Sequence, residues 1–139
     1  MKVKDMMTSS VIKVGAEEPV EVAARTMTHY NIGALPVCDA SGRLCGIVTD
    51  RDIVTRCLAA GREVKATKVR QVMTARVQTI ASGASEQEAA TLMGRNQIRR
   101  LPVTENGNLC GMLSLGDLSQ NAEAGNTLNR ISQNLSDRD

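Results

Sequence analysis

The chain has 139 residues and a formal net charge of +2, which is too small to indicate a nucleic acid or a membrane surface as its partner. Its hydrophobic content of 42% and charged content of 23% are typical of a soluble globular protein, and no apolar run approaches the roughly 18 residues of a membrane span. The N-terminus also lacks the apolar core of a signal peptide, so we expect a cytoplasmic protein. One Tyr without Phe or Trp argues against an aromatic platform for single-stranded nucleic acid.

The sequence contains two similar copies of one pattern, the first starting at Val3 and the second at Val69. The copies match with a shift of 66 positions as far as residues 35–37 and 101–103, and then with a shift of 65. This duplication predicts an α+β fold of two β-α-β-β-α repeats, packed with pseudo-two-fold symmetry around paired clefts. We expect the first repeat over residues 1–61, a linker over 62–68, the second repeat over 69–120 and a polar tail over 121–139.

The first repeat is expected to open with a short strand over residues 11–14 and a turn at Gly15. Pro19 suits the first turn of a helix. That helix buries one face, made of Val20, Ala23, Ala24 and Met27 at i, i+3, i+4 and i+7. In the second repeat, residues 85–88 have the spacing of a capping box, and Ala89, Ala90 and Met93 form the matching face.

A β-hairpin follows each helix. In the first repeat, apolar runs over residues 34–38 and 44–48 are separated by a polar loop. In the second, runs over residues 101–104 and 109–113 enclose Asn106-Gly107, a strong signal for a hairpin turn. The second loop is one residue shorter, which explains the change in shift.

The last helix of the first repeat is expected to begin near Asp50 and to end near Gly61. The apolar residues predicted to point inward from it are Ile53, Val54, Cys57 and Leu58. In the tail, Leu128, Ile131 and Leu135 fall at helical spacing, which is compatible with a short amphipathic helix, with a frayed end or with self-association.

A hydroxyl residue followed three positions later by an aspartate ends both hairpins: Thr49 with Asp52, and Ser114 with Asp117. A helix N-terminus favours a phosphate, and the hydroxyl adds a donor to it. An ionised Asp has only acceptors and can take both hydroxyls of a ribose. The same residue types are also favoured as helix caps that need no ligand, and duplication copies caps as well.

The chain resembles a tandem pair of CBS domains, the Bateman module, over about residues 1–120. The resemblance is carried by residues 3–8, 31–37 and 46–53 and by their second copies. It is nearest to the small stand-alone bacterial proteins of the stress and hypoxic-response type. It implies halves packed sheet against sheet, homodimers, and clefts between the repeats that bind AMP, ADP, ATP or S-adenosylmethionine.

The resemblance also implies which residues contact a ligand. Asp52 and Asp117 match the acid that binds the ribose, and Thr49 and Ser114 match the hydroxyl that faces the phosphate. The segment lining the base is matched by Val11, Ile12 and Val14, with Val77 and Ile80; the opposite wall is matched by Ala34, Leu35 and Pro36, with Leu101 and Pro102.

The two sites are expected to be unequal. Many nucleotide-binding members carry a basic residue before the strand of the opposite wall, and this chain has Arg99 and Arg100 there in the second repeat but Gly33 and Ala34 in the first. Two guanidinium groups contribute charge-assisted hydrogen bonds to a phosphate, of about 1.5–3 kcal/mol each. Surface ion pairs with nearby acids are the alternative role for the two arginines.

Four cysteines and one histidine have no metal-ligand spacing, so the cysteines are read as reduced, buried, small apolar residues. Cys38 and Cys45 flank one hairpin, a position from which they could face each other and oxidise under stress.

The sequence contains none of the nucleotide-hydrolase, dinucleotide, zinc-protease or hydrolase motifs, and we find no catalytic set in it. The leading interpretation is a regulatory sensor of adenosine-type nucleotides, without a required cofactor or metal. The alternative is a protein-interaction or scaffold module of a stress response that binds no nucleotide. The effector protein that would receive the signal is unknown.

Overall fold

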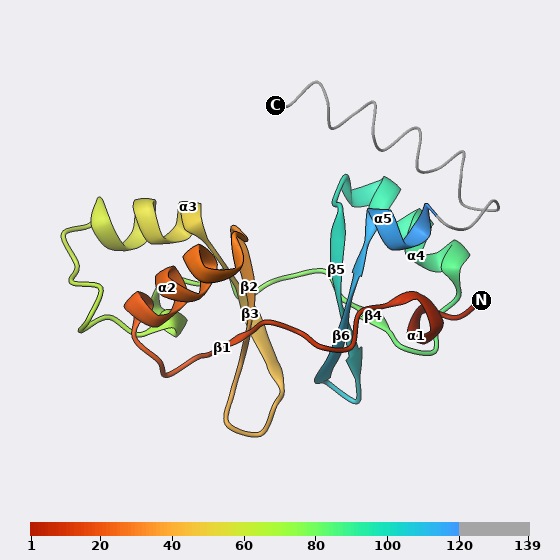
Figure 1. Ribbon diagram of the computed structural model, residues 1–139, viewed down its shortest axis with the longest axis horizontal. Helices are drawn as coiled ribbons and strands as arrows, with labels where there is room; N and C mark the ends of the chain where they lie inside the picture. Colours follow the sequence, from red (N-terminus) through yellow and green to blue (C-terminus); the bar gives the residue numbers. More distant parts are fainter. Residues whose placement is uncertain (120–139) are drawn as a thin grey trace. The chain divides into compact units, whose positions relative to one another are not determined.

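The computed structural model describes residues 1–119 and divides the chain into two compact units (Figure 1). Unit 2 comprises Ile12–Val77 with Gly107–Leu109, and the described part of unit 1 comprises Met1–Val11, Gln78–Asn106 and residues 110–119. The predicted amphipathic helix at Leu128, Ile131 and Leu135 lies outside the described residues.

Each unit is built on a three-stranded sheet with helices beside it, so the α+β fold of two repeats is confirmed. The elements of unit 2 are β1 (Val14–Gly15), α2 (Val20–Tyr30), β2 (Ala34–Cys38), β3 (Leu44–Thr49), α3 (Asp50–Asp52), the π-helix η1 (Ile53–Leu58) and the 3₁₀-helix η2 (Val69–Gln71). The elements of unit 1 are α1 (Val3–Met6), β4 (Ile80–Ala81), α4 (Glu86–Asn96), β5 (Arg100–Glu105), β6 (Asn108–Ser114) and α5 (Leu115–Leu118).

The hairpins confirm the sequence pattern. The strand order is β1-β2-β3 in one sheet and β4-β5-β6 in the other. β1 pairs with β2 in parallel and β2 with β3 antiparallel, with Ala34 opposite Thr49. The turn between β5 and β6 has Asn106 and Gly107 at φ +55° and +84°, the left-handed conformation that this dipeptide favours.

The start of each repeat packs in the unit that contains most of the other repeat. Val3 is fully buried in the core of unit 1, where its N–H donates to the Ala84 carbonyl at 2.8 Å. Val69 and Val72 are fully buried in the core of unit 2, where the Val69 N–H donates to the Glu18 carbonyl at 2.9 Å. Each compact core therefore combines residues from both halves of the sequence.

The strand predicted over residues 11–14 is wrong in its extent, because only Val14 belongs to β1. Val14 and Gly15 pair with Val37 and Cys38, while residues 11–13 have no regular structure. Pro19 is the N-cap of α2 and not its first helical residue. Ser85 does cap α4, accepting from the Glu88 N–H at 3.1 Å.

The apolar face predicted for the last helix of the first repeat is only half correct. Ile53 and Cys57 are buried, but Val54 and Leu58 are 54% and 59% exposed. The chain is α-helical over Asp50–Asp52 and then takes π-helical bonds, such as the Ala59 N–H to the Val54 carbonyl at 2.8 Å. Residues four apart stay on the buried face, and the residue after each of them turns to solvent. Gly61 follows this helix with φ +75°.

All four cysteines are free thiols. A register shift between Val37 and Cys38 places Leu44, and not Cys45, opposite Cys38 in the β2–β3 ladder. The hairpin therefore does not set Cys38 and Cys45 as a directly facing pair. Among the described residues, no helix is long and apolar enough to cross a membrane.

Candidate functional site

The candidate site of unit 2 lies where β3 ends and α3 begins. The Thr49 hydroxyl accepts from the Asp52 N–H at 3.0 Å, and the Asp52 Oδ2 accepts from the Thr49 N–H at 3.0 Å. Thr49 is half-buried and Asp52 is buried. This reciprocal arrangement is a capping box, so the capping role expected of these residue types is present.

Unit 1 repeats the arrangement between β6 and α5. The Ser114 hydroxyl accepts from the Asp117 N–H at 3.1 Å, and the Asp117 Oδ2 accepts from the Ser114 N–H at 2.8 Å. Both side chains are half-buried. A carboxylate has two oxygens, and the cap uses only one of them, so capping and ligand binding do not exclude each other.

The other oxygen differs between the two sites. The Asp52 Oδ1 lies 3.8 Å from the Arg56 Nε, which is an ion pair between residues four apart. Within residues 1–119, the only hydrogen bond or ion pair of the Asp117 carboxylate is its bond from the Ser114 N–H. Sequence reasoning did not single out Arg56, although its i+4 spacing from Asp52 is the signal that would have found it.

In each unit, one backbone hydrogen bond joins the start of the last helix to the residue just before the strand predicted to form the opposite wall of the site (β2 or β5). The Leu115 N–H donates to the Arg99 carbonyl at 2.7 Å, and the Asp50 N–H donates to the Gly33 carbonyl at 2.9 Å. Arg99 and Arg100 are both exposed. The backbone of Arg99 thus lies beside the helix start of unit 1, whereas unit 2 has Gly33 there, against the Asp50 carboxylate.

The remaining predicted residues differ in burial. The residues with little exposed surface are Val14, Leu35, Pro36, Ile80, Leu101 and Pro102; Val11, Ile12 and Val77 are half-buried, and Ala34 is exposed. Leu35 and Leu101 are fully buried, which leaves only their backbone to a ligand, whereas Val14 and Ile80 are 3% and 7% exposed. Val11 belongs to unit 1, whereas Ile12 and Val14 belong to unit 2. Val77 belongs to unit 2, whereas Ile80 belongs to unit 1. Each segment predicted to line the base is therefore divided between the two units.

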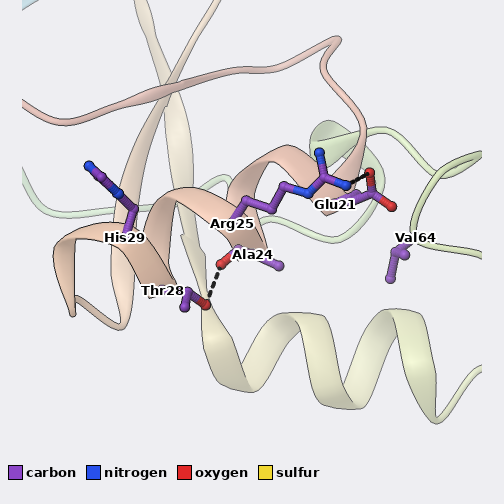
Figure 2. A pocket seen from close by; sticks show the side chains of 6 residues that line it. All are labelled: Glu21, Ala24, Arg25, Thr28, His29 and Val64. Atoms are coloured by element: carbon purple, nitrogen blue, oxygen red, sulfur yellow. Dashed lines mark hydrogen bonds and ion pairs between the residues drawn. The ribbon is translucent and has the colours of Figure 1, made fainter.

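A separate groove in unit 2 was not anticipated (Figure 2). It has a volume of about 400 Å³ and is lined by Glu21, Ala24, Arg25, Thr28, His29 and Val64. Figure 2 shows the Arg25 guanidinium directed at Glu21, a pair 3.0 Å apart. A neighbouring cavity of about 430 Å³ shares Ala24 and Thr28 and extends to Asp50 and Val54. The described lining of both cavities includes none of the predicted ligand residues.

Comparison with known proteins decides the family. The model of the CBS domain matches residues 3–59 and again residues 69–123. The chain belongs to the CBS-domain family. It is 41% identical to the CBS domain-containing protein YhcV of Bacillus subtilis over 138 residues, which is 96% of this chain and 97% of that protein. Two CBS domains in tandem form a regulatory module, and the tandem organisation inferred from the repeat is confirmed.

Two solved CBS-domain structures are informative. Hypoxic Response Protein I, solved with two coordinated zinc ions, matches with a TM-score of 0.77 and 34% identity over 87% of this chain and 98% of its own. CBSX2 in complex with AMP matches with a TM-score of 0.74 and 27% identity over 88% of this chain and 96% of its own. Within residues 1–119 of this chain, no group of three His, Cys, Asp or Glu residues could hold a metal ion.

Proposed function

We propose that this chain is a regulatory CBS pair that binds an adenosine nucleotide at the start of α5, with Asp117 accepting from the ribose hydroxyls. The observation that carries the proposal is the Ser114–Asp117 pair, in which one carboxylate oxygen caps the helix and the other has no partner within the described residues. The AMP complex of the related CBSX2 supports the ligand class. Candidate ligands are AMP, ADP, ATP and S-adenosylmethionine.

The unit 1 site is the stronger of the two for ligands that carry a phosphate. The Arg99 backbone is hydrogen-bonded to the helix start, the exposed guanidinium groups of Arg99 and Arg100 are proposed to reach a phosphate bound there, and Ser114 offers a hydroxyl donor. The corresponding place in unit 2 has the Asp50 carboxylate, which repels a phosphate. We therefore expect one tight site and one weak site per chain.

The regulatory output passes through a homodimer and an effector protein in this proposal. Unit 2 exposes Val54 and Leu58 on η1 and Tyr30 on α2. Val54 also lines the cavity between η1 and α2. Burying such a surface against a second copy removes it from water.

Isothermal titration of the full chain with AMP, ADP, ATP and S-adenosylmethionine tests the proposal. One adenosine ligand is expected to bind to the wild type, and Asp117→Ala is expected to weaken it about 10- to 100-fold, since hydrogen bonds to a charged group are worth about 1.5–3 kcal/mol. Asp117→Asn retains an oxygen that can cap Ser114 but loses the charge, so weak binding by this folded variant separates ligand contact from helix capping. Undetectable binding of all four ligands would contradict the proposal and favour the interaction-module alternative.

A further inference from the structure

We propose that Arg56 is a specificity-determining residue that keeps the unit 2 site weak by occupying Asp52. This inference rests on the proposed function, since it assumes that Asp52 is the ribose acid of that site. It goes beyond the proposal in assigning a role to a residue outside the ligand-binding set.

The Asp52 carboxylate is engaged at both oxygens. Its Oδ2 accepts from the Thr49 N–H at 3.0 Å, and its Oδ1 lies 3.8 Å from the Arg56 Nε. The side chain of Asp52 is only 12% exposed. A ribose that approaches this carboxylate must therefore share or displace the guanidinium contact.

The guanidinium is itself held in place by the backbone. The Arg56 Nη1 donates to the Met73 carbonyl at 3.1 Å and to the Val72 carbonyl at 3.4 Å. Val72 is fully buried in the core of unit 2, so the carbonyls that hold Arg56 belong to a packed segment. Moving the arginine away from Asp52 costs these hydrogen bonds as well as the ion pair.

The second repeat carries a different residue at the matching position. The shift of 65 that relates Asp52 to Asp117 relates Arg56 to Asn121. Asparagine has neither the charge nor the length of arginine, so it cannot form the same ion pair. The sequence difference and the contact between Arg56 and Asp52 therefore both indicate that the ribose acid is less available in the unit 2 site than in the unit 1 site.

Adenosine is the probe that isolates this effect, because it carries the ribose and base without a phosphate. In an Asp117→Ala background, which disables the unit 1 ribose acid, the titration reports the unit 2 site. Adding Arg56→Asn is expected to raise the affinity for adenosine by up to about fivefold, as for loss of a competing ion pair worth up to about 1 kcal/mol. Arg56→Gln, which keeps more of the side-chain length, is expected to give the same gain, and adding Asp52→Ala is expected to abolish it.

Arg62→Asn is the matched control, since it removes the same charge from an exposed arginine just beyond η1. Equal affinity in the Asp117→Ala protein with and without either Arg56 substitution would overturn the inference, and so would an equal gain from Arg62→Asn. Circular dichroism confirms that each variant is folded. Wild-type titration with AMP judges the proposed function separately, because it depends on Asp117 and not on Arg56.

Discussion

Gly46 lies directly against the backbone of Thr74: a Cβ atom at position 46 would overlap the Thr74 carbonyl oxygen. The two backbones are held together by the Ile47 N–H donating to the Thr74 carbonyl at 2.9 Å and the Thr74 N–H donating to the Ile47 carbonyl at 2.8 Å. Glycine is therefore required where the start of the second repeat packs onto β3. The matching Gly111 of β6 lies against Met7 and Thr8.

Gly46→Ala is expected to lower the free energy of unfolding by about 1–3 kcal/mol, because the added methyl group meets a backbone oxygen held by its own hydrogen bond. Gly111→Ala should cost less, since its closest contact is the flexible end of the Met7 side chain. Urea unfolding of the two variants measures the difference. Equal losses would show that packing of the repeat starts does not depend on backbone contact at Gly46.

Glu86→Val is expected to stabilise the protein by about 1 kcal/mol, because it removes a buried carboxylate oxygen that has no hydrogen-bond partner among the described residues, while the amino group of Met1, a residue whose side chain is 58% exposed, stays hydrated when the pair is lost. Glu86 is 6% exposed, its Oε1 lies 3.5 Å from the Met1 amino group, and its Oε2 is buried without a hydrogen-bond partner among the described residues. The matching position of the first repeat is Val20, which is fully buried. Denaturant unfolding is the measurement, with exposed Glu88→Val as the control; a loss of stability in Glu86→Val would contradict this prediction.

Replacing Arg99 and Arg100 by Ala should weaken AMP binding about tenfold or more and leave adenosine binding nearly unchanged. The reason is that the two guanidiniums are proposed to contact the phosphate, which adenosine lacks. The AMP affinity of the wild type should also fall with added salt more steeply than that of the double variant. Parallel titrations with the two ligands check this, and an equal loss for both would assign the arginines a structural or surface ion-pair role.

The cysteine thiols are expected to react slowly at neutral pH, because burial raises the pKa of Cys38, Cys45 and Cys110 above the ordinary value of 9.0. A raised thiol pKa favours the protonated form in the folded state. The contribution that the buried, protonated thiols make to the stability of the folded state is therefore fully present below pH 9.0, and it is lost as the pH rises through the raised pKa. Iodoacetamide labelling at pH 7.5, followed by mass spectrometry, should modify these thiols more slowly than it modifies glutathione. Cys38 should react more slowly than Cys45. Rapid labelling of Cys38 in the folded protein would contradict its burial.

Val54→Glu with Leu58→Glu should convert the proposed dimer of 14.9-kDa chains into a monomer, because two charges then occupy the exposed apolar surface of η1. Size-exclusion chromatography with light scattering measures the mass. Ala40→Glu, at an exposed position of the β2–β3 turn, is the control and should remain dimeric. A monomeric wild type would contradict dimerisation, and an unchanged mass in the double variant would exclude this surface as the interface.

Local chemistry explains why much of the fold was predictable. Asn106-Gly107 adopts left-handed conformations that few other dipeptides tolerate, so its hairpin is specified within a few residues. The capping boxes at Thr49 and Ser114 likewise depend on residues three apart. The repeat itself indicates the number of sheets, since a duplicated pattern forms the same elements twice.

The sequence alone determined the two repeats, their hairpins, the helix starts with their aspartates and the family to which the chain belongs. Only the tertiary structure decided that Val3 and Val69 pack in the unit of the other repeat, that Val54 and Leu58 face solvent, and that Arg56 pairs with Asp52. The physical reason is the range of the interactions. Turns and caps are made by neighbouring residues, whereas burial and the anchoring of Arg56 on Val72 and Met73 depend on segments that folding brings together from distant parts of the chain.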